Sequence, residues 1–198
     1  EIGLDLGRIE DFYTAHGITH GFMTTQVGRM FCQNTRCSTL RYFMVAGEKL
    51  VPFQPGSSYE FYNGYGPSES FAYITAQRVT SDSPFQPIGA ACPNNKIYII
   101  DSHGHRLPFG ACGELCVSGP QVALGYLNRP EKTAASFVPN PFSNERFYER
   151  MYRTGDIVRE LPDGRYDFVG RRDGQVKIRG FRVELTEVEQ IVRRFPGI

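Results

Sequence analysis

The sequence of 198 residues predicts a mixed α/β fold, and two observations carry that prediction. Up to about residue 84, segments with helical spacing alternate with β-prone segments, which is typical of a layered α/β core. After residue 84 the chain changes to short β-prone segments separated by Pro- and Gly-rich connections, which predicts a small sheet or a distorted, open β-barrel. The 21 glycines and 13 prolines also suit many turns and short strands better than a helix bundle.

In the first part of the chain, the apolar residues Leu6, Ile9 and Tyr13 recur at helical spacing within residues 4–16, and Gly17 suits the end of that helix. The elements expected to follow it are a strand over 18–23, a helix over 26–33, and strands over 41–45 and 59–62.

In the second part, Pro130 is expected in the first turn of a helix, because proline tolerates that position. Near the end, Thr186 and Glu189 have the spacing of a capping box and predict the start of another helix. The strands expected here cover 96–100, 114–117, 165–169 and 175–179, with a turn over 101–104.

Composition and charge exclude several classes of protein. The 22 Lys+Arg and 21 Asp+Glu give a formal net charge of +1, so neither nucleic acid nor an acidic membrane surface is expected as a partner. No stretch approaches about 18 apolar residues, and the first residues lack a secretory signal. The five cysteines are odd in number and scattered, which predicts free thiols in a reducing cytosol rather than a disulfide framework.

The first motif with chemical potential is the segment 63–69, Asn-Gly-Tyr-Gly-Pro-Ser-Glu, which is expected to form a turn after a strand. Its glycines let the backbone approach a ligand, and Tyr65 offers a flat ring to a nucleobase. Ser68 offers a hydroxyl to a phosphate oxygen, and Glu69 offers a carboxylate to Mg²⁺, a hard ion that prefers oxygen ligands. Taken alone, the string also fits an ordinary turn.

The second motif is the segment 152–156, Tyr-Arg-Thr-Gly-Asp. A carboxylate that a tight turn presents can accept hydrogen bonds from both hydroxyls of a ribose, which makes Asp156 a candidate ligand for a nucleotide. The alternative is an aspartate that caps its own turn or faces water.

The third motif covers 170–184, where acidic and basic residues alternate closely. Asp173 and Gly174 are expected to form a turn between two strands, and a turn of this kind can act as a hinge because few residues absorb the change in backbone angles. The alternative is a basic pair of strands with solvated charges.

Together and in this order, the three motifs resemble those of the adenylation domains of non-ribosomal peptide synthetases. These domains belong to the adenylate-forming superfamily, which also includes acyl-CoA synthetases and luciferases. Segment 63–69 is similar to the family signature Asn-x-Tyr-Gly-Pro-Thr-Glu, with Ser68 in place of Thr. The resemblance extends over essentially the whole chain and also rests on the segments 41–50, 113–119, 125–127, 152–156 and 170–184.

The resemblance implies that the chain is part of an enzyme that joins an amino-acid carboxylate to the α-phosphate of ATP, releases pyrophosphate, and passes the aminoacyl group to the phosphopantetheine thiol of a peptidyl carrier protein domain. Neighbouring synthetase domains would be further partners, and the location would be cytoplasmic. It also implies three units, namely an α/β core segment over 1–84, a distorted β-barrel subdomain with a ribose-binding loop over 85–172, and the start of a small mobile C-terminal subdomain over 173–198.

The resemblance assigns roles to individual residues. Glu69 would bind Mg²⁺, Asp173 would be the hinge of the C-terminal subdomain, and Lys177 would act in the thioester-forming state. Phe168 stands where several relatives carry a tyrosine, so a hydroxyl contact would be lost there. The nucleotide-binding residues would be Asn63, Gly64, Tyr65, Gly66, Ser68, Asp156, Phe168 and Arg171.

The amino-acid pocket implied by the resemblance has apolar or small walls. Since no residue of this set is charged, a medium or large apolar amino acid is expected, because an unpaired buried charge is costly. Ordinary core packing is the alternative for the same residues. The set is Phe22, Met44, Ala46, Gly64, Ala72 and Tyr73.

The sequence also departs from the family. The Gly/Ser/Thr-rich phosphate loop, the aspartate that pairs with the substrate amino group and the C-terminal lysine find no match in these residues, so the chain by itself is expected to be an inactive internal piece. The alternatives are a ligase similar to acyl- or aryl-CoA synthetases, and a non-catalytic nucleotide-binding module.

Overall fold

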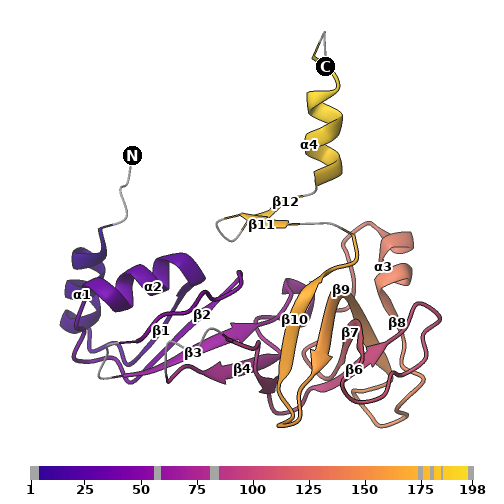
Figure 1. Ribbon diagram of the computed structural model, residues 1–198, viewed down its shortest axis with the longest axis horizontal. Coiled ribbons are helices and arrows are strands. Elements are labelled where there is room, and N and C mark those ends of the chain that lie inside the picture. Colours follow the sequence, from indigo (N-terminus) through magenta and orange to yellow (C-terminus); the bar gives the residue numbers. More distant parts are fainter. Residues whose placement is uncertain are drawn as a thin grey trace.

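The computed structural model describes residues 5–55, 59–80, 85–173, 176–178, 181–183 and 185–195. It confirms the mixed α/β class, with helices packed beside one sheet and a second sheet built from later strands (Figure 1). Among the described residues, no helix is long and apolar enough to cross a membrane. All five cysteines are free, as their scattered positions predicted.

The first sheet has the strand order β1-β2-β3-β4-β5. The three strands β1, β2 and β3 run parallel, and β4 and β5 continue the sheet in antiparallel pairing. The bounds are β1 His20–Thr24, β2 Tyr42–Ala46, β3 Glu60–Tyr65, β4 Thr75–Arg78 and β5 Ala90–Ala91.

Helices α1 (Leu6–Ala15) and α2 (Thr25–Asn34) lie on one face of this sheet (Figure 1). Asp5 caps α1 by accepting the backbone N–H of Arg8 at 3.1 Å, and Gly17, with a φ of +61°, follows its end as predicted. The core between helices and sheet is aromatic, because the rings of Phe31, Phe43 and Phe61 pack together in it. Side chains alternate along a strand, so every second residue of β2 faces away from these helices.

The strand predicted to end at residue 62 continues to Tyr65, which corrects the expected turn at Asn63 and Gly64. The physical reason is that β3 lies in the middle of the sheet and is paired on both sides, where Asn63 lies opposite Val45 of β2 and Gln77 of β4. The turn comes later, and the short 3₁₀ helix η1 (Ser68–Ser70) follows it.

The second sheet is antiparallel, with the order β10-β9-β7-β6 and the short strand β8 paired to β9. Its strands are β6 Lys96–Ile100, β7 Cys112–Ser118, β8 Phe137–Pro139, β9 Arg150–Glu160 and β10 Tyr166–Arg171. β6 and β10 are the ends of this strand order, and Tyr166 of β10 forms an antiparallel bridge to Gly89, which directly precedes β5 of the first sheet. Its core joins that of the first sheet, since Tyr65 and Ile74 pack with Leu115, Val117 and Val158.

The remaining elements follow the predicted order. Helix α3 (Pro130–Ser136) has its proline in the first turn, and the hairpin β11 (Val176–Ile178) and β12 (Phe181–Val183) precedes helix α4 (Leu185–Val192). Helix α4 begins at Leu185, and the side chain of Thr186 lies outside the described residues, so the predicted capping box stays a prediction. The unit boundaries near residues 84 and 172 stay predictions.

Candidate functional site

A cavity of about 490 Å³ lies where the first sheet meets the second. Its walls come from β3, from the segment after β2, and from β9 and β10. It brings together six of the eight residues predicted to bind a nucleotide, which come from positions far apart in the sequence: Asn63, Gly64, Tyr65, Asp156, Phe168 and Arg171.

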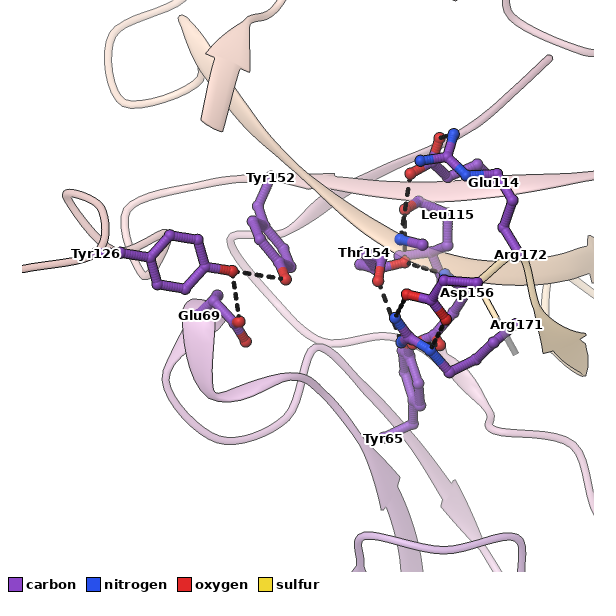
Figure 2. A network of polar contacts seen from close by, with 12 residues as sticks. Tyr65, Glu69, Glu114, Leu115, Tyr126, Tyr152, Thr154, Asp156, Arg171 and Arg172 are labelled. Atoms are coloured by element: carbon purple, nitrogen blue, oxygen red, sulfur yellow. Dashed lines mark hydrogen bonds and ion pairs between the residues drawn. The ribbon is translucent and has the colours of Figure 1, made fainter. Parts of the chain in front are cut away.

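Asp156 is the centre of the polar network in this cavity (Figure 2). Its carboxylate is almost fully buried, accepts the hydroxyl of Tyr65 on Oδ2, and accepts Nη1 of Arg171 on Oδ1 at 2.6 Å. An ionised carboxylate has about four lone-pair sites. Asp156 therefore retains capacity for further donors, such as the hydroxyls of a ligand.

A bulge in β9, and not a tight turn, presents Asp156, which corrects the sequence prediction. The pairing of β7 with β9 shifts between Glu114 and Cys116, and Gly155 has a φ of +73° that favours glycine. Thr154 Oγ1 accepts the backbone N–H of Asp156 at 3.0 Å and donates to the carbonyl of Leu115 at 2.8 Å. These contacts fix the bulge from both sides.

Arg171 links Asp156 to the predicted hinge residue. Its Nε and Nη2 bind the two carboxylate oxygens of Asp173 at 2.8 and 2.6 Å, while Nη1 also donates to the carbonyl of Thr154 at 3.2 Å. The hydrogen bond with Asp173 is the main cause that raises the pKa of Arg171. Burial lowers this pKa, and the negative charge of Asp156 raises it further. Arg171 thus keeps its charge within the cavity wall.

Tyr65 is a donor in this network at ordinary pH. Burial raises the pKa of its hydroxyl well above the usual value, and the negative charge of Asp156 adds to that effect. Phe168 stands beside Tyr65, with 6.2 Å between the ring centroids. The two rings give the cavity an aromatic wall next to its carboxylate.

Glu69, the predicted Mg²⁺ ligand, lies on η1 and is not part of the lining of this cavity. Its Oε1 accepts the hydroxyl of Tyr126 at 2.7 Å, and that hydroxyl lies 3.4 Å from the hydroxyl of Tyr152 (Figure 2). The backbone N–H of Ala123 donates to the carbonyl of Glu69 at 2.9 Å. A half-buried carboxylate of this kind fits a magnesium ion, which is bound by one or two carboxylates together with phosphates and water.

Gly66 and Ser68 also lie outside the lining of the cavity. Ser68 is exposed at the start of η1. Gly66 has a structural reason to be glycine, because a Cβ atom there would lie 2.5 Å from the Cα of Tyr73 and 2.7 Å from the carbonyl oxygen of Ala72.

Replacing Gly66 by alanine is expected to lower the free energy of unfolding by about 1–3 kcal/mol, since both of those contacts are with backbone that has to shift. Urea denaturation measures the change. The matched control is Gly170→Ala, where an added Cβ would meet nothing within 4 Å. Equal stability of both variants would contradict the prediction.

A second cavity, of about 500 Å³, collects three of the six residues predicted for an amino-acid pocket, Phe22, Met44 and Tyr73. Gly64 belongs to the first cavity, and a Cβ on it would lie 3.0 Å from the Sδ of Met44, which lines the second cavity. The other two residues are not in the lining of either cavity, since Ala46 is buried and Ala72 is exposed.

The sequence prediction missed His20, an ionisable residue in the wall of the second cavity. It also missed parts of the first cavity, namely the segment after β2, the residues before β5 and two residues of β10: Gly47, Glu48, Lys49, Leu50, Gln86, Ile88, Asp167 and Gly170. Of these, only Gly170 and the residues of segment 41–50 carried a signal, because segments 41–50 and 170–184 resemble the family.

Lys177 belongs to β11, where it lies opposite Arg182 of β12. The side chain of Lys177 is outside the described residues, so its predicted role stays a prediction.

The comparisons with known proteins agree with these features. The family model of AMP-binding enzymes matches residues 3–127, which is more than half of the chain. The chain is 40% identical over 198 residues to bacitracin synthase 1 of Bacillus licheniformis, covering 100% of this chain and 4% of that protein. It is 40% identical over 201 residues to tyrocidine synthase 3 of Brevibacillus parabrevis, covering 97% of this chain and 3% of that protein.

Among solved structures, the chain is similar to PA1221, described as an NRPS protein containing adenylation and PCP domains, with a TM-score of 0.84 and 31% identity. That match covers 100% of this chain and 42% of the solved chain. The chain therefore spans less than half of the length of each of these relatives. The matches confirm the resemblance that the motifs indicated, and the chain belongs to the AMP-binding enzyme family.

Proposed function

We propose that this chain is part of the adenylation domain of a non-ribosomal peptide synthetase, in which an amino acid and ATP react to give an aminoacyl adenylate and pyrophosphate. The observation that carries the proposal is the first cavity, which combines the aromatic side chains of Tyr65 and Phe168 with the carboxylate of Asp156. Its volume of about 490 Å³ lies within the range of about 300–1,000 Å³ that is typical of small-molecule sites.

Within this proposal, the residues of the first cavity bind the adenosine part of ATP. Asp156 accepts hydrogen bonds from the ribose hydroxyls, while the rings of Tyr65 and Phe168 provide an apolar contact for the base. Arg171 holds the carboxylate of Asp156 in place through the contact at 2.6 Å. Mg²⁺ would neutralise phosphate charge when bound, and Glu69 is the carboxylate that suits it.

The second cavity is proposed to receive the amino-acid side chain. Phe22, Met44 and Tyr73 favour a medium or large apolar substrate, and Gly64 lets the two cavities come close. The proposed partner is a peptidyl carrier protein domain with its phosphopantetheine thiol, supported by the relatives in which an adenylation domain and a PCP domain occur together. The proposed location is the cytoplasm, together with neighbouring synthetase domains.

Amino-acid-dependent exchange of pyrophosphate into ATP tests the proposal, across a panel of amino acids. The chain of 198 residues is compared with the same sequence extended on both sides from its gene. Exchange by the extended chain only is expected, because the phosphate loop and the lysine of the family have no match in this sequence. Exchange by the short chain would show that residues present here replace them.

The same assay separates the alternatives. Activity with carboxylic acids and coenzyme A, and none with amino acids, would favour the acyl- or aryl-CoA synthetase class. Binding of AMP without exchange in either chain would favour a non-catalytic nucleotide-binding module.

Tyr126 is expected to orient Glu69, because its hydroxyl donates to Oε1 at 2.7 Å. In the extended chain, Tyr126→Phe should raise the Mg²⁺ concentration for half-maximal exchange about three- to tenfold, the equivalent of one lost hydrogen bond of about 0.5–1.5 kcal/mol. Binding of AMP, which needs no metal, should stay unchanged.

The matched control is Tyr98→Phe, which removes a hydroxyl that accepts from Asn140 at 3.3 Å. It should leave the Mg²⁺ dependence as it is. A parallel loss of AMP affinity in Tyr126→Phe would instead indicate that Tyr126 supports the local fold.

A further inference from the structure

The turn after β6 gathers three side chains of the types that bind transition metals. Asp101, His103 and His105 each offer one ligand atom, and these three atoms lie within 4.8 Å of one another. None of the three residues lines either cavity, and the proposed function does not use them. The group is therefore unexplained by the chemistry described above.

The backbone of the turn holds the three residues in a defined arrangement. Asp101 Oδ1 accepts the backbone N–H groups of His103 at 2.8 Å and His105 at 2.9 Å. The backbone N–H of Asp101 donates to the carbonyl of His105 at 2.9 Å, and Gly104 adopts a φ of +86° that favours glycine. A metal would thus meet ligands on a backbone that is already ordered.

The second oxygen of Asp101 faces the two imidazoles and is hydrogen-bonded to that of His105. Oδ2 lies 3.2 Å from His105 Nδ1 and 3.9 Å from His103 Nδ1. The two rings are stacked, with centroids 6.0 Å apart and 24° between their planes. One carboxylate oxygen and two imidazole nitrogens therefore converge on one small volume.

The two distances from Asp101 Oδ2 to the histidine nitrogens are close to those that zinc requires. Zinc bonds to nitrogen and oxygen of about 2.0–2.2 Å place the ligands of a tetrahedral site about 3.3–3.6 Å apart. The contact at 3.2 Å already lies near this range, and the contact at 3.9 Å requires a shift of only a few tenths of an ångström. Both histidine side chains are 78% exposed, so their rings have room to make that shift.

We propose that Asp101, His103 and His105 form a binding site for a divalent transition-metal ion of the zinc, nickel or copper class, with a fourth position open to water. Imidazole is a preferred ligand of these ions, whereas Mg²⁺ and Ca²⁺ prefer sites built from oxygen alone. The site therefore differs in metal preference from the carboxylate of Glu69. The proposal of this metal site does not depend on the proposed function.

The test is a titration of the chain, free of any affinity tag, with ZnCl₂, followed by calorimetry and by the NMR signals of the imidazole groups. The chain has four histidines, so His16 and His20 serve as internal references, and the imidazole signals separate this site from zinc on the five cysteines. Zinc should shift the signals of His103 and His105 and leave the other two in place. A large excess of Mg²⁺ should not compete.

The variants Asp101→Asn, His103→Ala and His105→Ala should each weaken zinc binding at this site by at least about tenfold. Asp101→Asn retains an oxygen that accepts the backbone N–H groups of the turn, so it separates loss of a ligand from loss of the turn. His16→Ala, on α1, is the matched control and should bind as the unchanged chain does. Equal shifts of all four imidazoles, no shift at all, or unchanged affinity in His105→Ala would each overturn the proposal.

Discussion

The variant Asp156→Asn is expected to lower the affinity for AMP by about ten- to a hundredfold. The asparagine side chain is nearly as large as that of aspartate, but it is neutral and has one accepting oxygen in place of two. A hydrogen bond to a charged group contributes about 1.5–3 kcal/mol, and each 1.4 kcal/mol corresponds to a factor of ten. In the proposed complex the ribose hydroxyls donate to this carboxylate. In the variant they therefore lose hydrogen bonds to a negatively charged group.

The same change affects the unbound protein, because Arg171 and the Tyr65 hydroxyl both bind this carboxylate. Arg171 keeps its contacts with Asp173, and therefore the fold should survive with reduced stability. Calorimetry of AMP binding and thermal unfolding are measured on the same samples. If the apparent affinity for AMP fell only as far as the fraction of unfolded variant explains, this would argue against a contact between Asp156 and the ribose.

The matched control is Asp163→Asn. Asp163 is also paired with an arginine, Arg165, but it lies in an exposed turn away from the cavity lining. Surface pairs of this kind contribute about 0–1 kcal/mol. This control should therefore keep both its stability and its affinity for AMP.

Local spacing predicted most of the elements, because helix ends and short strands depend on nearby residues. The helix at Leu6–Ala15, the proline at the start of α3 and the strand β6 follow from apolar spacing and from the placement of glycine and proline. The errors fall where long-range pairing decides the structure. Gly64 reads as part of a turn in the sequence but lies in β3, where it pairs with Ala76 of β4.

The candidate site was predictable only in part, because long-range packing also decides which residues meet there. Asp156 and Tyr65 were found through motifs, yet their contact joins residues 91 positions apart and cannot follow from spacing. Asp167 and Gln86 line the cavity without any signal in the sequence, because their place depends on how the two sheets meet. The partnership of Tyr126 with Glu69, 57 positions apart, was equally hidden.

Strand β7 carries one buried acidic residue, Glu114, which has a structural role. The side chain is 4% exposed, and its two oxygens receive Arg153, Arg172 and the backbone N–H of Gly155. The hydrogen bond with Glu114 is the main reason that the pKa of Arg153 is raised. One carboxylate thus joins β7 to the bulge of β9 that presents Asp156.

The variant Glu114→Ala is expected to lower the free energy of unfolding by about 3–5 kcal/mol, toward the lower end because both arginine side chains reach solvent. Removing the carboxylate leaves a partly buried guanidinium uncompensated and the N–H of Gly155 without its acceptor. Affinity for AMP should fall as well, because the bulge of β9 loses one of its supports. Urea denaturation and AMP binding measure the two effects.

Two comparisons isolate the cause. Glu145→Ala removes a carboxylate that is 68% exposed and pairs with Lys96 at 2.6 Å, and it should cost no more than about 1 kcal/mol. Glu114→Gln retains an oxygen for the N–H of Gly155 but loses the charge, so its stability should lie between that of Glu114→Ala and the unchanged chain. If Glu114→Ala were no less stable than Glu145→Ala, the buried carboxylate would not be what holds the bulge of β9. The hydroxyl of Thr154 would then be the main support of the bulge.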